Sequence, residues 1–343
     1  MSPVVAIAGA TGVVGQEFLR LLAERQFPIA QLRLMASARS AGTTIPFAGQ
    51  DIVVEDLATA SFEGVDVAFF SAGSERADEA RRAAREGALV IDNSSAFRMD
   101  PDVPLVVPQV NGDAARAHQG LIANPNCSTI LMVMVLAPLA RKVPIRRVVV
   151  STYQAVSGSG APGLAELDAQ AEAHRNGETL PVSVYPQPIF GNAIPFVQAF
   201  DDGDLTTEEW KMVRETRRIL AQPELAVSCT CVRVPVHRAH SEAVNIEFER
   251  EVTPDEVRAW LAEADGVRVV DAPEALAQDP SAAYPTPRDA EGRDDVLVGR
   301  IRRDPGEARA IDLWLTGDQI RKGAALNAVE IAEHVLGVTA PTS

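Results

Sequence analysis

The sequence predicts an α/β fold in which a doubly wound parallel sheet is joined to a second domain of the α+β type. Short apolar runs typical of buried strands alternate with helical stretches up to about residue 140, and this alternation indicates a parallel sheet with right-handed crossovers. A glycine-rich turn directly after the first run indicates a ligand-binding loop. Beyond residue 145 the strand patterns are longer, which predicts a mixed or antiparallel sheet.

Composition and charge exclude several classes of function. A chain of 343 residues is long enough for two domains. The net charge of −15 and the lack of a dense Lys/Arg run argue against a nucleic-acid partner, so an anionic ligand needs local positive charge. No apolar run reaches the roughly 18–20 residues of a membrane span, and we expect no cleavable leader. These features predict a cytoplasmic protein with neither a nucleic-acid nor a membrane partner.

The three cysteines are too few for a disulfide framework, which fits a reducing cytoplasm. Cys229 and Cys231 have one residue between them, so on a strand both would point to the same face. They form neither a CxxC redox motif nor a zinc knuckle. We therefore predict no metal site.

The first strand and its turn are typical of a dinucleotide-binding loop. Val4–Ala8 is an apolar β-branched run, and an amphipathic stretch from Gln16 to Arg25 follows the turn. Gly9 permits the tight turn, Gly12 lets the backbone approach a pyrophosphate, and Gly15 lets helix and strand pack closely. The spacing is GxxGxxG rather than GxGxxG, and the alternative is a glycine-rich turn of an unrelated α/β protein.

The second strand, Leu32–Ala36, favours NADP over NAD. NAD enzymes usually place an acid near the end of this strand to bind the ribose 2′-hydroxyl. Here Ser37, Ala38, Arg39 and Ser40 follow, and Arg39 with the two hydroxyls suits a 2′-phosphate. The alternative for Arg39 is a solvated loop arginine.

The rest of the first domain continues the alternation. A charged helix from Glu75 to Glu86 lies between predicted strands, which are Val65–Phe70, Ala88–Asp92, Leu105–Val107 and Leu121–Ala123. Ligands of such sheets bind beyond the carboxyl ends of the strands. Ser71, Arg98 and Cys127 all follow strand ends and are expected to converge there.

Cys127 is the candidate nucleophile. It lies in the turn Asn124–Thr129, between a strand and a long apolar run, Ile130–Ala140, whose length predicts a buried helix. A thiol at a helix N-terminus has its pKa lowered from about 8.5 toward roughly 7 or below, which favours the thiolate. The alternative is a small buried hydrophobic residue.

The second half supplies further polar candidates. A β-branched run, Ile145–Val156, contains Gln154 near its end, and a Ser/Gly turn and a helix, Leu164–Arg175, follow. Thr206 is expected to cap a helix on which Glu208 and Lys211 share one face, either at a site or as a surface ion pair.

The last part of the chain is predicted to complete the second sheet. The strands Val227–Val236 and Ala243–Glu249 flank a turn that holds Arg238, His240, Ser241 and Glu242. Three later strands, a surface loop and a final helix are predicted at Val267–Val270, Val296–Arg302, Ala310–Leu315, Pro280–Pro287 and Asp318–Leu336.

Together these motifs resemble those of the aspartate-semialdehyde dehydrogenase family, over essentially the whole chain. The segments that carry the resemblance stand in the family's order: GATGVVG at 9–15, NSSAFR at 93–98, NPNCST at 124–129, YQAVSGSG at 153–160, GNAIP at 191–195, EEWKM at 208–212 and RVPVHRAHSE at 233–242. The resemblance implies the reversible NADPH-dependent reduction of L-aspartyl 4-phosphate to aspartate 4-semialdehyde and phosphate, in the biosynthesis of lysine, threonine, methionine and isoleucine.

The resemblance also implies roles for individual residues. Cys127 would form an acyl-thioester, His240 would act as general acid/base, and Gln154 would orient the substrate or thioester. Arg233 would bind the substrate α-carboxylate and Glu208 its ammonium, while Arg98 and Lys211 would hold phosphate. The implied contacts of NADP are Gly9, Thr11, Gly12, Val13, Val14, Arg39, Ser40, Ser157, Gly158 and Gln319.

The implied architecture is an NADP-binding Rossmann-like domain of residues 1–127 and a catalytic and dimerisation domain of residues 128–317. The C-terminal helix, residues 318–343, would return to the first domain, and the protein would be a homodimer or homotetramer. Two alternatives remain. N-acetyl-γ-glutamyl-phosphate reductase shares the general plan, but its N-acetylated substrate needs no acid such as Glu208. A non-catalytic NADP-binding sensor would need none of Cys127, Gln154, Arg233 and His240.

Overall fold

The computed structural model describes residues 2–201 and 203–338, and the chain forms two compact units. Unit 1 contains residues 1–126 and the chain from residue 324 onward, and unit 2 contains residues 127–323. These limits differ by a few residues from the predicted domain boundaries. Cys127 belongs to unit 2 because it begins a helix of that unit, and residues 318–323 stay with the strand that precedes them. The predicted segment 339–343 lies outside the described residues.

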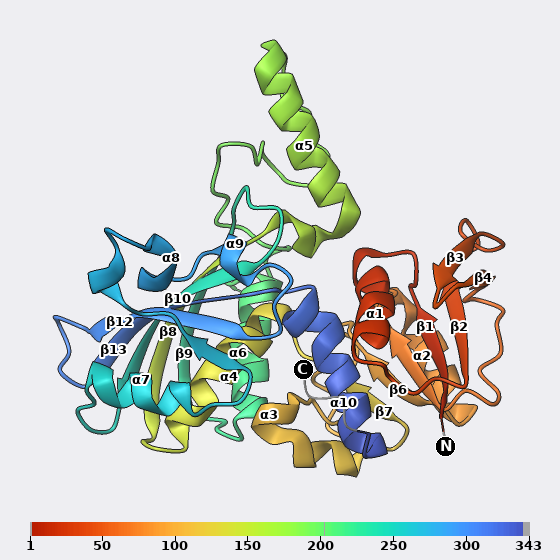
Figure 1. The fold of residues 1–343 in the computed structure, drawn as a ribbon, viewed down its shortest axis with the longest axis horizontal. Coiled ribbons are helices and arrows are strands. Elements are labelled where there is room, and N and C mark those ends of the chain that lie inside the picture. Colours follow the sequence, from red (N-terminus) through yellow and green to blue (C-terminus); the bar gives the residue numbers. More distant parts are fainter. Residues whose placement is uncertain (1, 202, 339–343) are drawn as a thin grey trace. The chain divides into compact units, whose positions relative to one another are not determined.

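Unit 1 is a doubly wound sheet, as predicted. Its strand order is β3-β4-β2-β1-β5-β6-β7, and all neighbours pair in parallel except β3 with β4 (Figure 1). The chain moves outward from the central β1 in both directions, which places the turn after β1 at the topological switch point. The strands are β1 Val4–Ala8, β2 Gln31–Ala36, β3 Thr44–Phe47, β4 Gln50–Asp56, β5 Val67–Phe70, β6 Leu89–Asp92 and β7 Leu121–Ala123.

The helices of unit 1 pack on this sheet around an apolar core. The ring of Phe18 on α1 (Val13–Glu24) stacks on Phe69 of β5 with centroids 4.8 Å apart. The C-terminal helix α10 (Leu326–Leu336) packs against α1 and β6 and ends at Gly337, whose φ of 65° suits a helix C-terminus. This confirms that the final helix returns to the first domain. The other helical segments are Ser74–Arg76, α2 Ala77–Arg85, α3 Pro108–Asn111 and Gly112–Ala117.

Predictions for three segments were wrong or incomplete. The hairpin β3–β4 was not predicted, and most of its residues are exposed or only partly buried. The strand expected at 105–107 does not form: Leu105 makes only an isolated bridge with Ala123, since Pro108 starts a helix at once. The final α-helix does not begin at Asp318. The buried Asp318 side chain accepts hydrogen bonds from the N–H groups of Ile320 and Arg321, as a helix cap does, but the turn that follows, Arg321–Ala325, is π-helical and α10 begins at Leu326.

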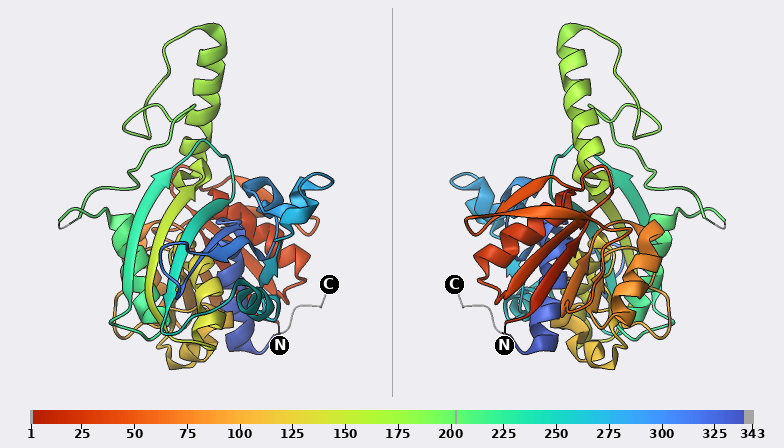
Figure 2. Two further views of the ribbon diagram at one scale, coloured as in Figure 1. Left: turned by 90° about the vertical axis from the view of Figure 1, so that its left-hand side faces the viewer. Right: turned by 90° about the vertical axis from the view of Figure 1, so that its right-hand side faces the viewer.

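Unit 2 is built on a mixed six-stranded sheet, again as predicted. The order is β11-β12-β13-β10-β8-β9, with parallel pairing of β8 with β9 and of β11 with β12. The neighbouring strands and the helix α6 (Thr207–Ile219) can be followed in Figure 2. The strands are β8 Ile145–Gln154, β9 Ala226–Arg233, β10 His240–Phe248, β11 Val267–Val269, β12 Val296–Arg303 and β13 Ala310–Gly317.

The two faces of this sheet differ. On one face α4 (Cys127–Ala140), α6 and α7 (Pro254–Ala262) cover the strands, so Thr152 and Gln154 of β8 are buried. Tyr153 points to the opposite face, is exposed, and lies beside Trp314 with ring centroids 5.2 Å apart. The catalytic candidates lie on the covered face, at the strand ends.

Two predictions in unit 2 need correction. His240, Ser241 and Glu242 are not in a turn but begin β10, because Ser241 pairs with Tyr153 and His240 with Gly317. The expected surface loop at 280–287 contains the short helices α8 (Pro280–Ala283) and α9 (Pro287–Ala290), each with proline in its first turn.

The helix α5 (Gly160–Asn176) stands away from the sheet of unit 2, together with the long irregular segment that follows it (Figure 1). Buried Glu166 on α5 accepts hydrogen bonds from the N–H and Oγ of Ser183, at 2.9 and 2.7 Å, and thereby holds this segment. Within the described part of the chain, no helix is both long and apolar enough to cross a membrane.

Candidate active site

Cys127 is the first residue of α4, a helix of apolar side chains that are almost all buried. Its own side chain is partly exposed, whereas Cys229 and Cys231 are buried. A Cβ on Gly323 would come within 3.0 Å of the Cys127 Cβ, so the glycine leaves room for the cysteine. The N-terminus of a 14-residue helix carries positive partial charge, which favours a thiolate at this position.

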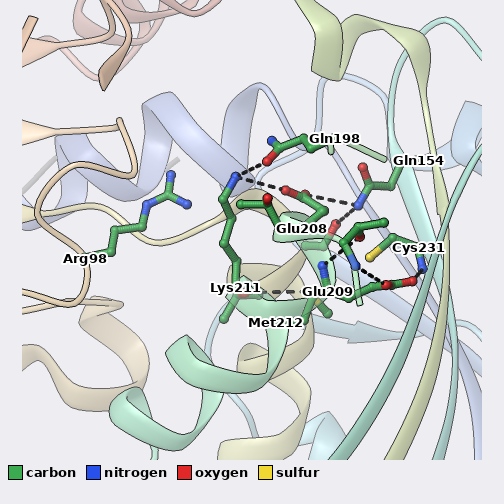
Figure 3. A network of polar contacts seen from close by, with 12 residues as sticks. Arg98, Gln154, Gln198, Glu208, Glu209, Lys211, Met212 and Cys231 are labelled. Carbon is green, nitrogen blue, oxygen red and sulfur yellow. Dashed lines mark hydrogen bonds and ion pairs between the residues drawn. The ribbon is translucent and has the colours of Figure 1, made fainter. Parts of the chain in front are cut away.

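Gln154, the last residue of β8, is tied to the neighbour of the cysteine. Its buried amide Nε2 donates to Ser128 Oγ at 3.0 Å and to Glu208 Oε1 at 3.3 Å (Figure 3). One amide therefore links the start of α4 to the start of α6. Ser128 was not predicted, since a serine after a helix start is common in many folds.

Glu208 and Lys211 do form an ion pair, but it is not the surface pair considered as an alternative. Thr206 and Glu209 form a capping box that begins α6 and directs Glu208 inward, where it is 2% exposed. Lys211 Nζ donates to Glu208 Oε2 at 3.2 Å and to Gln198 Oε1 at 2.6 Å (Figure 3). An exposed ion pair contributes little to stability. A buried pair of charged side chains is instead a candidate for binding the charged groups of a ligand.

Arg233 ends β9 and is buried as well. Its Nη1 donates to the carbonyl oxygen of Ala155 at 2.6 Å, and its guanidinium lies 6.0 Å from the ring centroid of Tyr185. The Tyr185 hydroxyl in turn donates to the Val156 carbonyl at 3.2 Å. The guanidinium is thus supported from two sides and retains further N–H donors for a ligand.

His240 is fully buried at the start of β10. The backbone N–H of Ala155 donates to its Nδ1 at 3.0 Å, and among the described residues its Nε2 has no hydrogen-bond partner. Burial, with a smaller contribution from Arg233, lowers the pKa of His240 well below its ordinary value of 6.5. The imidazole is therefore neutral around pH 7.

Gly158 lies where Arg233 and His240 come together. A Cβ at Gly158 would be 2.9 Å from Arg233 Nη1 and 3.3 Å from His240 Nε2. Any side chain here would fill the space in front of both groups. The glycine therefore allows the backbone to lie close to two polar groups that converge on it.

Ser157 and Gln319, two predicted cofactor contacts, bind each other. Gln319 Nε2 donates to Ser157 Oγ at 2.6 Å, while its Oε1 accepts from the N–H of Ala239 at 2.8 Å. Ala239 has a φ of 70°, a left-handed conformation that a non-glycine residue rarely adopts. The bond to Gln319 holds this strained residue directly before His240.

Two further hydrogen bonds, which the sequence did not predict, hold His240 and the loop before it. Thr316 Oγ1 donates to the His240 carbonyl at 2.9 Å, and Arg238 Nε donates to Asp318 at 2.7 Å. These partners lie about 80 residues away along the chain, and no local pattern marks them. Only the pairing of β10 with β13 brings them together.

The glycine loop of unit 1 has the geometry that a dinucleotide needs. A Cβ on Gly9, whose φ is +89°, would lie 2.2 Å from the Ser71 oxygen, and one on Gly15 would lie 2.2 Å from the Gly9 oxygen. Gly12 caps α1 without a side-chain hydrogen bond, and the first turn of α1, which starts at Val13 and Val14, has no acid. With exposed Thr11 beside it, this helix N-terminus fits a pyrophosphate.

The other candidates of unit 1 differ in their surroundings. Arg39 and Ser40 lie on the turn after β2, where Arg39 is exposed. Arg98 is buried and donates from Nε to the Asn124 carbonyl at 3.0 Å and from Nη2 to the Asn93 carbonyl at 2.7 Å. Arg98 therefore braces the turn that precedes Cys127.

The remaining cysteines form an inert pair. The Sγ atoms of Cys229 and Cys231 are 3.6 Å apart on one face of β9, as the spacing predicted. The hydrogen bond to Cys231, together with burial, raises the pKa of the Cys229 thiol well above its ordinary value. Within residues 2–201 and 203–338, no three His, Cys, Asp or Glu side chains gather as metal ligands.

Comparison with known proteins covers both units. Residues 4–118 match the family described as semialdehyde dehydrogenase, NAD binding domain, and residues 136–322 match its dimerisation domain. The aspartate-semialdehyde dehydrogenase of Prochlorococcus marinus is 47% identical over 333 residues, which are 97% of this chain and 95% of that protein.

Solved structures show the same similarity. Aspartate semialdehyde dehydrogenase II of Vibrio cholerae, complexed with ASA, is 43% identical with a TM-score of 0.94 over 98% of this chain and 99% of that one. The Candida albicans aspartate semialdehyde dehydrogenase with NADP is 25% identical with a TM-score of 0.74, over 98% of this chain and 99% of that one.

Proposed function

The chain belongs to the aspartate-semialdehyde dehydrogenase family, and we propose that it catalyses the reversible NADPH-dependent reduction of L-aspartyl 4-phosphate to L-aspartate 4-semialdehyde and phosphate. The observation that carries this proposal is the buried chain of contacts from Ser128, beside Cys127, through Gln154 to Glu208. It supports a site in which the nucleophile and a carboxylate suited to a free amino group act on one substrate. The product would feed the biosynthesis of lysine, threonine, methionine and isoleucine.

Each candidate residue of unit 2 receives a role that its surroundings support. Cys127 attacks the acyl carbon and forms a thioester, which divides one difficult transfer into two easier steps. Arg233 binds the substrate α-carboxylate with donors of its planar fork, and Glu208 binds the ammonium. Gln154 orients the thioester. The family resemblance assigns phosphate to Lys211 and to Arg98, and His240 acts on the proton at the reacting centre.

The cofactor is NADP, bound through the glycine loop of unit 1. Gly9, Gly12 and the start of α1 would hold the pyrophosphate, and exposed Arg39 with Ser40 would bind the 2′-phosphate. The family resemblance also assigns cofactor contacts to Ser157, Gly158 and Gln319. NADPH, when bound, supplies the hydride that reduces the thioester. The NADP named in the Candida albicans structure supports this choice.

We also propose the wider organisation. Unit 1 is the NADP-binding domain and unit 2 the catalytic and dimerisation domain of a cytoplasmic homodimer or homotetramer. The match of residues 136–322 to a dimerisation domain supports self-association.

The experiment is an assay of NADPH formation with L-aspartate 4-semialdehyde, with and without phosphate, repeated with N-acetyl-glutamate semialdehyde and with NAD in place of NADP. Phosphate-dependent activity on the first aldehyde, higher with NADP, is the expected result. Activity only on the second aldehyde would assign the chain to the arginine-pathway reductase. No activity on either, with NADP still bound, would favour a sensor.

A further inference from the structure

Lys211 is held by two acceptors that differ in charge. Its Nζ donates to the carboxylate Oε2 of Glu208 at 3.2 Å and to the neutral amide Oε1 of Gln198 at 2.6 Å (Figure 3). An ammonium group has three N–H donors, and within the described residues these two bonds use two of them. The third donor is left for a ligand.

The main chain at Gln198 has a strained conformation. Its φ of 64° lies in the left-handed region, which residues other than glycine rarely adopt. Such residues persist only where the surrounding structure holds them, and they are concentrated at functional sites. A glycine would adopt this conformation without strain, so the conformation alone does not explain a glutamine at this position.

The segment around Gln198 is fixed at both ends. Before it, Ile194 and Arg233 exchange two backbone hydrogen bonds, at 2.8 and 2.9 Å. After it, the carbonyl oxygen of Ala199 accepts from the N–H and the Oγ1 of Thr207, the first residue of α6, at 2.8 and 3.1 Å. Both ends are therefore attached to elements that carry candidates for substrate binding, and the amide of Gln198 is held close to α6.

Glu208 alone does not fix Lys211 throughout the proposed reaction. Glu208 is proposed to bind the substrate ammonium, so a second cation then shares its carboxylate. The two cations repel each other, and this repulsion weakens the attraction between Lys211 and Glu208. The amide of Gln198 is not shared with the ammonium, so its bond to Lys211 is retained.

We propose that Gln198 is a positioning residue that keeps Lys211 available to phosphate while the substrate ammonium occupies Glu208. This inference rests on the proposed reaction and specifies what holds Lys211 in it. A neutral acceptor suits this role, because an acid at the same position would hold Lys211 but would also repel the phosphate. An apolar side chain would not hold Lys211 at all.

The first test separates the amide of Gln198 from the strain of its backbone. Gln198→Gly removes both, whereas Gln198→Ala removes the amide and keeps the strain. In both variants KM for phosphate should rise about three- to tenfold, as for the loss of one hydrogen bond, while KM for the semialdehyde stays within about twofold. Gln26→Gly, at an exposed glutamine whose φ is 49°, is the matched control and should behave as wild type.

Two results of this test would overturn the proposal. A wild-type KM for phosphate in Gln198→Gly would show that the effect of Gln198→Ala comes from the backbone. An equal rise of both KM values would show that Gln198 supports the whole segment rather than Lys211.

The second test changes the charge at this position. Gln198→Glu keeps an acceptor for Lys211 but adds a negative charge near the bound phosphate, so KM for phosphate should rise about five- to thirtyfold. The rise should become smaller at higher ionic strength, because salt screens the repulsion. A KM for phosphate at or below the wild-type value would mean that Lys211 does not bind phosphate from this position, and would overturn the proposal.

The third test measures binding of inorganic phosphate to the NADP-loaded enzyme by calorimetric titration. L-2-Aminobutyrate is added as an inactive analogue, since it carries the ammonium and the α-carboxylate of the substrate but no aldehyde. Gln198→Gly should raise the Kd for phosphate about three- to tenfold with the analogue bound and less than about twofold without it. Equal effects with and without the analogue would refute the inference.

The titration also separates the inference from the proposed reaction. If the wild type shows the expected binding but does not oxidise aspartate semialdehyde, the proposed reaction is wrong and the role of Gln198 stands. If the wild type is active but its Kd for phosphate is unchanged in Gln198→Gly with the analogue bound, the reaction stands and the role of Gln198 is refuted.

Discussion

Two rows of side chains on one face of the unit 2 sheet have contrasting properties. The outer row, at the strand ends, contains Arg233, Gln154 and His240. The inner row, two residues further from the site, contains Cys231, Thr152 and Glu242, which lie opposite one another on β9, β8 and β10. Both rows are buried, yet every residue of the outer row is hydrogen-bonded to a strand end, a loop or a helix start.

The difference lies in what surrounds each row. The ends of the strands meet loops and helix starts, so the main chain of Ala155 and the side chains of Ser128 and Glu208 orient the outer side chains. The inner row has few such partners: within the described chain, Thr152 Oγ1 and both carboxyl oxygens of Glu242 make no hydrogen bond. Position relative to the strand end, rather than residue type, therefore decides which polar residues can act.

The largest expected effect comes from replacing Cys127, at the start of α4 beside the outer row, in comparison with Cys231 of the inner row. Cys127→Ala should lower turnover by more than about a thousandfold while NADP binding stays near normal, because it removes the nucleophile. Cys231→Ala, in the inner row, should keep activity within about twofold. Steady-state kinetics and calorimetric titration with NADP measure both. Comparable activity losses in the two variants would contradict the contrast between the rows.

A smaller effect is expected from Arg233→Lys. The ammonium cannot reproduce the planar fork that grips a carboxylate and the Ala155 carbonyl together, so KM for the semialdehyde should rise about 10- to 100-fold. Arg288→Lys, at an exposed position, is the control. An unchanged KM and kcat would mean that the carboxylate is bound elsewhere.

Glu242→Gln tests the inner row through stability. Burial raises the pKa of the Glu242 carboxyl in the folded state, so the unfolded chain releases this proton at a lower pH than the folded one. Wild-type stability should therefore fall as pH rises above about 4.3, by up to about 1.4 kcal/mol per pH unit, until the carboxyl ionises in the folded protein. Glu242→Gln should not lose stability in this way, because an amide has no proton to release in this pH range.

Denaturant unfolding at pH 5.5 and pH 8.5 measures the effect. The stability of Glu242→Gln relative to wild type should be greater at pH 8.5 than at pH 5.5, with activity at pH 7 within about twofold. Glu291→Gln, at an exposed position, should show no such trend. A pH-independent difference would indicate that Glu242 is ionised or paired.

The smallest effect is expected from replacing Tyr185, whose ring lies beside Arg233 of the outer row. Tyr185→Phe removes the hydrogen bond to the Val156 carbonyl but keeps the ring beside Arg233, so KM should rise only about two- to fivefold, as for the loss of about 0.5–1 kcal/mol. Tyr185→Leu should raise KM further, since it also removes the ring, while kcat changes little. Tyr284→Phe, at an exposed tyrosine, is the control. If kcat fell as much as KM rose, Tyr185 would support the chemistry rather than Arg233.

Local patterns predicted the elements that depend on neighbours in the chain. The parallel order of unit 1, the glycine loop and the capped start of α6 were all visible, because a turn, a cap and an apolar period act within a few residues. The failures have a common cause. His240 was assigned to a turn and Asp318 to a helix, since the pairing of β10 with β13 and the buried role of Asp318 depend on residues about 80 positions away.

The sequence by itself determined which residues are available for chemistry: a cysteine at a helix start, glycines where a backbone must approach a ligand, and acids and arginines in segments that resemble one enzyme family. Only the tertiary structure decided how they are oriented. The N–H of Ala155 donates to Nδ1 of His240, and Gly158 lets the backbone lie close to Arg233. The physical reason is that every residue except proline carries a backbone N–H, so no residue type marks the one that orients a side chain. A glycine is visible in the sequence, but the side chains that lie close to it are brought there only by folding.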